Sequence, residues 1–346
     1  MRMRILGTPP PCNSRRLNSA SRFPLRTFRP SPSRRFDLGQ IIMSLVVVGS
    51  ANADFVLSVD RLPAPGETIG ASQLEVFPGG KGANQAAAAA RLGHETIFVA
   101  QFGADDNGDF LRAALVESGV RVDRVKSVAT APTGSAYIFL QPSGENSIVI
   151  LGGANQHGWA LGDEDVKAIA GAGAVLLQRE IPESVNLAVS EVAREHGVPV
   201  ILDAGGVDAP LDPKILKNLA VLSPNETELS RLTGLPTSTE DEMVAAARSL
   251  LDSGVDRVLI KLGERGSAMV SKDGGVVKQS AVPVASVVDT TGAGDCFTAA
   301  FAVAHVRGRS VEAALAFASA AASLCIQKKG AMTSLPCLAD LPQDLR

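Results

Sequence analysis

Along most of this chain, short apolar runs alternate with segments of helical periodicity. Strands joined by helices lie parallel, so this alternation predicts a parallel sheet with helices on both faces. With 346 residues, 45% of them apolar, the chain can bury the core of one large α/β domain. The predicted elements are strands 97–100, 175–178, 200–203, 220–223 and 258–261, and helices 107–118, 183–196, 226–233, 240–253, 293–306 and 311–326.

Polar residues follow several predicted strands. The apolar run from Leu45 to Val48 ends at Gly49 and leads into Asn52 and Asp54, which project to the same side of an extended segment. Ligands of open α/β sheets bind beyond the carboxyl ends of the strands, so both side chains could face a ligand. Ordinary polar loop residues are the alternative. Glu180 and Asp203 occupy similar places.

Two further segments predict exposed strands. Residues 61–78 contain Pro63, Pro65, Gly66 and Pro78, and residues 134–151 hold two β-rich runs around the turn at 142–145. These strands could form a small sheet that covers the site as a lid.

Gly79-Gly80-Lys81-Gly82-Ala83-Asn84-Gln85 precedes an alanine-rich helix predicted from Ala86 to Leu92. A flexible loop at a helix N-terminus suits an anion, and Lys81 adds charge. The segment is not a Walker A loop, because Gly82 follows Lys81 where that motif has Ser or Thr. A simple junction between loop and helix is the alternative.

A second small-residue loop, Asp289-Thr290-Thr291-Gly292-Ala293-Gly294-Asp295, also leads into a helix. The amides of Gly292, Ala293 and Gly294 could point together at a phosphate, aided by the helix dipole. A carboxylate beside a phosphate repels it, so Asp295 is predicted to act as a general base for a hydroxyl. A tight turn with Asp295 as N-cap is the alternative.

Two local patterns have structural alternatives. Asn225 and Glu228, three residues apart, form a capping-box sequence. The segment from Lys261 to Gly266 contains two glycines, which would let a flat ring or ribose lie against the backbone, although a hairpin turn fits equally well.

Residues 1–42 differ in composition from the remainder, with nine arginines, six prolines, five serines and one acid, Asp37. This composition resembles an organellar transit peptide, which we expect to be disordered. A plastid is the expected destination; mitochondrial targeting, or translation from Met43 to give a cytosolic form, are alternatives. A basic tail that binds RNA or membranes is a further alternative.

The rest of the chain is acidic. Residues 1–42 carry +8 (nine arginines, one aspartate), which leaves −11 of the total of −3 for residues 43–346. We therefore expect no nucleic-acid partner. No apolar run reaches the roughly 18 residues that a bilayer-spanning helix needs, so we expect no membrane insertion.

Taken together, Asn52-Ala53-Asp54, the loop from Gly79 to Gln85, Asn225 to Glu228 and the loop from Asp289 to Asp295 resemble the PfkB (ribokinase-like) family of carbohydrate kinases. The resemblance covers roughly residues 44–340. It implies a three-layer α/β fold with a central, mostly parallel sheet and a small β-sheet lid. If such a lid forms, its exposed apolar residues such as Ile138 and Phe139 need a partner surface, and we expect the lid of a second subunit to provide it in a homodimer.

The resemblance also implies the roles of individual residues. Asp295 would be the base, and the amides of Gly292, Ala293 and Gly294 the anion hole. The residues expected around the sugar are Asn52, Ala53, Asp54, Gly80, Lys81, Gly82, Ala83, Asn84, Glu180 and Asp295. The residues expected at the nucleotide are Asn225, Lys261, Leu262, Gly263, Glu264, Arg265, Gly266, Gly294, Asp295 and Ser319. Ser319 stands where related kinases often have His or Asn, and Lys261 where Thr is common.

Two cations are implied as well. Glu228 would orient hydrated Mg²⁺ through water. A monovalent cation, expected to be K⁺, would lie in a loop formed by Asp289, Thr291, Cys325, Lys328, Gly330 and Ser334.

The main functional hypothesis is therefore ATP-dependent phosphorylation of D-ribose at O5. Alternatives are a kinase for 2-deoxyribose, fructose or a nucleoside, and a sugar-binding sensor without catalysis. A nucleotide-dependent oxidoreductase is disfavoured, because no G-x-G-x-x-G follows the first strand.

Overall fold

The computed structural model describes residues 4–5 and 43–346. In this part of the chain, nine strands form one large sheet. In spatial order they are β14 (Val276–Gln279), β13 (Ser267–Ser271), β12 (Arg257–Lys261), β11 (Val221–Ser223), β10 (Val200–Gly206), β9 (Ala174–Arg179), β2 (Leu45–Val48), β5 (Thr96–Gly103) and β6 (Arg121–Val128). The strands from β12 to β6 pair in parallel, and β13 and β14 add an antiparallel edge.

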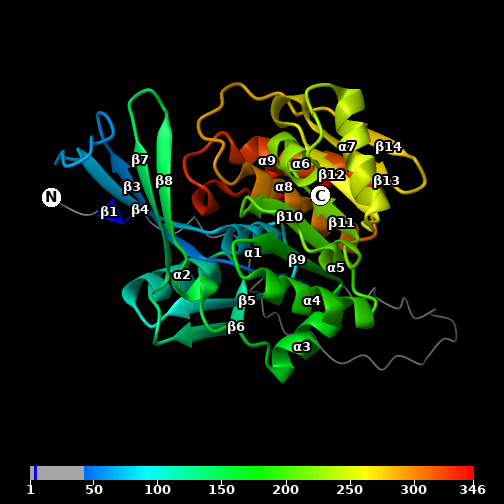
Figure 1. The fold of residues 1–346 in the computed structure, drawn as a ribbon, viewed down its shortest axis with the longest axis horizontal. Helices are drawn as coiled ribbons and strands as arrows, with labels where there is room; N and C mark the ends of the chain where they lie inside the picture. Colours follow the sequence, from blue (N-terminus) through cyan, green and yellow to red (C-terminus); the bar gives the residue numbers. More distant parts are fainter. Residues whose placement is uncertain (1–3, 6–42) are drawn as a thin grey trace, which may run out of the picture.

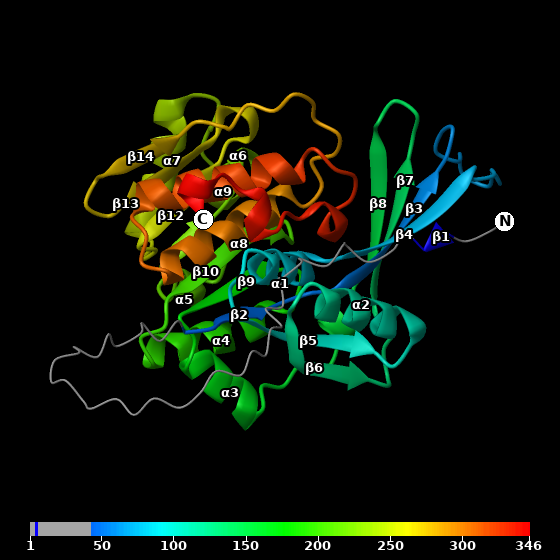
Figure 2. The ribbon, with the colours of Figure 1, turned by 180° about the vertical axis from the view of Figure 1, so that it is seen from behind.

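Helices cover both faces of this sheet (Figures 1 and 2). One face carries α1 (Lys81–Arg91), α2 (Asp106–Glu117), α8 (Ala293–Val306) and α9 (Val311–Cys325). The other carries α3 (Asp163–Ala170), α4 (Glu183–Glu195), α5 (Pro213–Leu216), α6 (Glu226–Thr233) and α7 (Glu240–Asp252). The predicted α/β class is confirmed.

Alternation along the central strands builds the two cores. Leu45 and Val47 of β2 pack in the core with α1 and α8, whereas Val46 and Val48 pack in the core with α4 and α7. Successive side chains of a strand point to opposite faces, so a strand covered on both faces must be apolar throughout. The central apolar runs were predictable for this reason.

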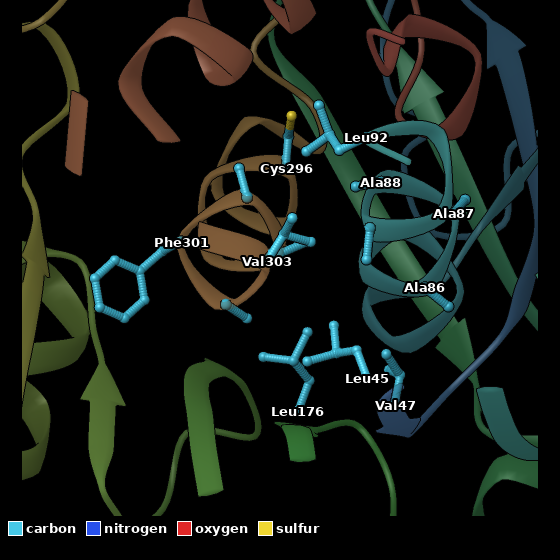
Figure 3. Packing of buried hydrophobic residues seen from close by; sticks show 14 of the residues in the cluster. Leu45, Val47, Ala86, Ala87, Ala88, Leu92, Leu176, Cys296, Phe301 and Val303 are labelled. Carbon is cyan, nitrogen blue, oxygen red and sulfur yellow. The ribbon is translucent and has the colours of Figure 1, made fainter. Parts of the chain in front are cut away.

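Alanines let α1 and α8 approach closely. Ala86 and Ala88 of α1 lie in one buried cluster with Cys296 and Val303 of α8, and Figure 3 shows the two helices side by side above the sheet. Small side chains bring helix axes near to each other. The N-terminal turns of α1 and α8 are thereby held together.

A second, smaller sheet stands beside the main body (Figures 1 and 2). Its strand order is β1 (Arg4–Ile5), β4 (Gln73–Gly79), β3 (Asn52–Ser58), β7 (Gly134–Leu140) and β8 (Asn146–Leu151). β3 pairs with β4 and β7 with β8 in antiparallel fashion, whereas β3 and β7 run parallel. Of the predicted transit peptide only Arg4 and Ile5 are among the described residues, and the rest of that prediction lies outside them.

The small sheet differs in detail from its prediction. In the segment predicted at 61–78, strand β4 begins only at Gln73. An additional strand, β3, begins at Asn52. Asn52 and Asp54 were predicted on an extended segment, but no strand was predicted at residues 52–58, because their partners, β4 and β7, lie far along the chain. Ile138 and Phe139, expected to be exposed, are partly buried. The exposed apolar side chains of the sheet are Tyr137, Ile148, Val149, Ile150 and Leu151.

Other elements also departed from the predictions. β6, whose residues are mostly polar and partly exposed, and the short helix α3 were not predicted. Helix α1 begins at Lys81, five residues before the predicted start. Helix α8 begins at Ala293 as predicted. Within residues 4–5 and 43–346, no helix has the length and hydrophobicity needed to cross a bilayer.

Candidate active site

The predicted motifs meet where β2, β9, β10 and β12 end and where α1 and α8 begin. Asp295, in the first turn of α8, is 6% exposed. Its Oδ2 accepts a hydrogen bond from Asn84 Nδ2 at 2.9 Å and its Oδ1 one from Gln85 Nε2 at 3.2 Å. Gln85 in turn accepts from Gln178 Nε2 at 2.8 Å. A chain of amides thus fixes the carboxylate of Asp295.

Burial raises the pKa of Asp295, because few water molecules can solvate its charge. The nearby positive charge of Lys81 and the hydrogen bond from Asn84 act in the opposite direction, while Asp203 and Glu180 raise the pKa further. The net result is a pKa above the usual value, so the carboxylate is a stronger base than an exposed aspartate.

Gly80, just before α1, and Gly82, in the first turn of α1, allow the start of this helix to lie directly on the segment after β2. A Cβ on Gly82 would come within 2.6 Å of Ser50 N, and one on Gly80, whose φ is 87°, within 2.7 Å of Ala51 Cα. This contact creates a small polar junction: Glu180 Oε2 accepts from Ser50 Oγ at 2.6 Å and from the Lys81 amide at 3.0 Å. Close backbone approach is therefore the reason for these glycines.

Lys81 lies among acidic groups. The negative charges of Asp295, Asp203 and Glu180 raise its pKa above the usual range, and burial only partly opposes them. Lys81 therefore stays charged, and its Nζ lies 2.9 Å from the point where a Cβ on Gly205 of β10 would sit.

Asn155, in the short 3-10 helix Gly153–Gln156, was not predicted as a site residue. Its Nδ2 donates to Asn52 Oδ1 at 2.8 Å and to the Ala51 carbonyl at 3.0 Å, and its Oδ1 accepts from the Ala51 amide at 3.0 Å. Asn155 is 2% exposed and lies 103 residues from Asn52 in sequence. It fixes the orientation of Asn52, and no local pattern pointed to it.

The carboxylate of Asp54, on β3, lies against Gly79, where a Cβ would come within 2.0 Å of Oδ2. Burial, together with the negative charges of Glu180 and Asp295, raises its pKa from 3.8 to about 8. Asp54 therefore keeps its proton at neutral pH and can donate a hydrogen bond.

The anion site is predicted at the N-terminus of α8. Gly292, the N-cap, has φ 77°, and a Cβ there would meet Ala331 Cα at 2.9 Å. The Ala293 amide already donates to the Thr290 carbonyl at 3.2 Å. First-turn amides have no partner within a helix, and with the helix dipole they favour a phosphate.

A cavity of about 650 Å³ opens beside this helix end. Of the residues predicted at the nucleotide, those that line it are Lys261, Gly263, Glu264, Gly266, Gly294 and Ser319. Asn225, Leu262, Arg265 and Asp295 do not line it; Arg265 instead pairs with Glu226. Apolar residues from the segment 281–287, among them Val282 and Val287, complete one wall and were not predicted. A cavity with an apolar wall and an anion site at one end suits a nucleoside polyphosphate.

Asn225 and Glu228 form the capping box that the sequence allowed. Asn225 Oδ1 accepts from the Glu228 amide and Glu228 Oε2 accepts from the Asn225 amide, both at 2.8 Å. The second oxygen of Glu228 is not used by the cap. In the described residues no group of three His, Cys, Asp or Glu side chains is arranged to hold a metal ion. Mg²⁺ that remains hydrated needs only one or two carboxylates plus phosphates, so Glu228 fits that role.

The residues of the predicted cation loop lie together. Asp289 accepts from the amides of Thr291 at 2.9 Å and Gly330 at 2.8 Å. Cys325 Sγ lies 2.9 Å from Ser334 Oγ, and the Lys328 amide donates to the Cys325 carbonyl at 3.2 Å. Asp289 thus joins the segment before α8 to the segment after α9.

Comparison with known proteins places this geometry in context. The profile of the family described as pfkB family carbohydrate kinase matches residues 43–338. Ribokinase of Arabidopsis thaliana is 52% identical over 296 residues, which cover 84% of this chain and 78% of that protein. Ribokinase of Haemophilus influenzae is 37% identical, covering 85% of this chain and 95% of the relative. The solved structure of Arabidopsis thaliana ribokinase complexed with ribose and ATP superposes with a TM-score of 0.85 at 50% identity, covering 88% of this chain and 99% of that one.

The raised pKa of Asp54 predicts a pH-dependent stability. Between its ordinary pKa of 3.8 and its folded pKa of about 8, the unfolded chain has lost the proton that the folded chain keeps. The contribution of Asp54 to stability is therefore complete below about pH 4 and is lost as the pH rises towards about pH 8. We expect Asp54→Asn to become progressively more stable than the wild type across this range. Thermal unfolding of both proteins without sugar, at several pH values, tests this, and a stability difference that does not change with pH would contradict it.

Proposed function

The chain belongs to the pfkB family of carbohydrate kinases, and we propose that Asp295 is the general base with which it phosphorylates D-ribose at O5. It is an ATP-dependent ribose kinase, with ADP and ribose 5-phosphate as products. The observation that carries the catalytic proposal is the place of Asp295. Its carboxylate accepts a hydrogen bond from Asn84 of α1, a residue expected at the sugar, and its neighbour Gly294 lines the nucleotide cavity.

In the proposed reaction, Asp295 accepts the proton of the O5 hydroxyl as that oxygen attacks the γ-phosphorus of ATP. The O5–phosphorus bond forms, and the bond from phosphorus to the bridging oxygen breaks, so ADP leaves with the electron pair. The burial that raises the pKa of Asp295 supports this role, because a more basic carboxylate accepts the proton more readily.

The sugar would bind between β3 and the start of α1. Asn52 and Asp54 project from β3, and Lys81 and Asn84 from the first turn of α1. Asn84 Oδ1 is buried and has no hydrogen-bond partner among the described residues, so it can accept from a hydroxyl group. Paired polar groups of this kind reject ligands that lack the matching hydroxyls, which supports selectivity for a sugar.

The charge of the transferring phosphoryl group would be stabilised by the first-turn amides of α8. Mg²⁺, when bound to the ATP phosphates, supplies further positive charge, and Glu228 would hold it through water. K⁺ would occupy the loop around Asp289. Because Asp289 accepts hydrogen bonds from the amides of Thr291 and Gly330, a cation there would order the segment that precedes Gly292.

A homodimer through the lid is also proposed. Strand β8 is an edge strand of the small sheet, and four consecutive apolar residues, Ile148 to Leu151, are 46% to 60% exposed. An exposed apolar edge strand is prone to associate with another chain. A second lid of the same kind would cover these side chains in a symmetric, self-complementary contact.

Replacement of the base tests the proposed mechanism. We expect Asp295→Asn to keep the fold, since an asparagine fits the same space, and to lower kcat for ribose by about 10²-fold or more. Thermal unfolding checks the fold, and a coupled ADP assay measures kcat. A variant with wild-type kcat would contradict the proposal.

The same assay with 2-deoxyribose, fructose and a nucleoside in place of ribose tests the substrate, since kcat/KM should be highest for ribose.

Cation dependence is tested by exchanging K⁺ for Na⁺ at constant ionic strength. We expect a higher rate in K⁺, and we expect Asp289→Ala to remove most of the difference by releasing the loop. The ADP assay with both proteins in both salts measures this. Equal wild-type rates in the two salts would contradict the proposed cation site.

Sedimentation tests the lid contact. We expect the wild type to sediment as a dimer and the variant Val149→Glu/Leu151→Glu as a monomer, because burying two carboxylates in an apolar contact is costly. Val116→Glu, at an equally exposed residue of α2, is the matched control and should remain dimeric. A monomeric wild type would rule out the lid dimer.

A further inference from the structure

Lys261, the last residue of β12, brings a positive charge to the phosphate end of the nucleotide cavity. Its side chain is 14% exposed and lines that cavity. The Nζ atom lies 3.7 Å from the point where a Cβ on Gly294 would sit. The ammonium group therefore lies beside the first turn of α8, at the predicted anion site.

Asp203, the middle residue of β10, holds Lys261 in this place. Its Oδ2 accepts from Lys261 Nζ at 2.7 Å and from Thr298 Oγ1 at 2.8 Å, and its Oδ1 accepts from the Gly205 amide at 2.9 Å. Thr298 is one helical turn after Gly294, on the same side of α8. A single carboxylate thus connects β10, β12 and α8.

This ion pair is expensive to bury. Asp203 is 2% exposed, and taking a carboxylate and an ammonium out of water often costs more than their attraction returns. Burial alone would raise the pKa of Asp203, but Lys261, Lys81 and the Gly205 amide together hold it below the usual range. The carboxylate of Asp203 is therefore ionised beside Lys261.

An ammonium group has three N–H donors, and Asp203 is the one acceptor that the described residues show for Lys261. The two remaining N–H donors of Lys261 can bond to an anion in the cavity. Residues 4–5 and 43–346 place no second lysine or arginine among those that line this cavity. Lys261 is thus the cationic side chain best placed to meet a phosphate bound at Gly294.

We propose that Lys261 contacts the phosphate chain of the nucleotide and stabilises the transferring phosphoryl group, and that Asp203, supported by Thr298, is its positioning residue. The inference rests on the proposed phosphoryl transfer and adds a charged side chain to the amides of α8. Lys261 forms no covalent bond; its charge offsets that of the phosphoryl oxygens as the bond to ADP breaks.

The variant Lys261→Met separates phosphate contact from a structural role. We expect it to weaken binding of a non-hydrolysable ATP analogue by about tenfold or more, leave adenosine binding unchanged, and lower kcat by about 10²-fold. Calorimetric titration with both ligands and the ADP assay measure these effects. Lys261→Arg should restore part of the activity, and Lys272→Met, at an exposed lysine that pairs with Asp256, is the matched control. Unchanged affinity for the analogue, or an equal loss for the analogue and adenosine, would overturn the proposal.

A double-mutant cycle tests whether Asp203 acts through Lys261. We expect Asp203→Asn to lower kcat with little change in the KM for ribose, and Asp203→Asn/Lys261→Met to be no slower than Lys261→Met alone, because the aspartate acts through the lysine. The double variant leaves no unpaired buried charge, so it can be measured even if Asp203→Asn unfolds. Rate losses that simply add would refute the positioning role. If the wild type phosphorylates no sugar, the proposed function fails, whereas the comparison of ATP analogue and adenosine still decides the role of Lys261.

Discussion

The buried carboxylate of Asp295 is the interaction on which the site depends. Asn84 and Gln85 of α1 donate hydrogen bonds to its two oxygens. Two helices whose contacting residues are 211 and 210 positions apart in the sequence therefore meet at one carboxylate. A buried carboxylate is tolerated only when it is hydrogen-bonded. The amide chain that continues to Gln178 meets this requirement and ties both helices to β9. The same burial makes the carboxylate basic, so the contact that orders the helices also prepares the group for proton transfer.

Small residues make this arrangement possible. Gly80 and Gly82 bring the start of α1 onto the segment after β2, and alanines let α1 pack closely on α8. The charged side chains then lie close together in a largely buried region. Lys81 is near Asp295, Asp203 and Glu180. Lys261 is near Asp203. Each positive charge has a negative neighbour. The site therefore offers paired charges to a sugar and a phosphate without leaving any buried charge alone.

Much of the fold could be predicted because local patterns determine it. Apolar runs such as Leu45 to Val48 specify doubly covered strands, and the loop from Asp289 to Asp295 marked the start of α8. The remainder depends on distant partners. Strand β3 is defined by β4 and β7, Asn155 reaches Asn52 across 103 residues, and Asp203 meets Lys261 and Thr298 across 58 and 95 residues. No local pattern marks such contacts, so Asn155 and the contacts of Asp203 with Lys261 and Thr298 emerged only from the structure.

The central claim is that this arrangement directs the phosphoryl group of ATP to O5 of ribose, where Asp295 removes the proton. Phosphorus NMR of the reaction mixture tests it most directly, because coupling through the new ester bond identifies the carbon that carries the phosphate. The account predicts one new sugar phosphate, whose phosphorus couples to the two protons on C5 of ribose. Coupling to the anomeric proton, or release of inorganic phosphate with no sugar phosphate, would contradict it.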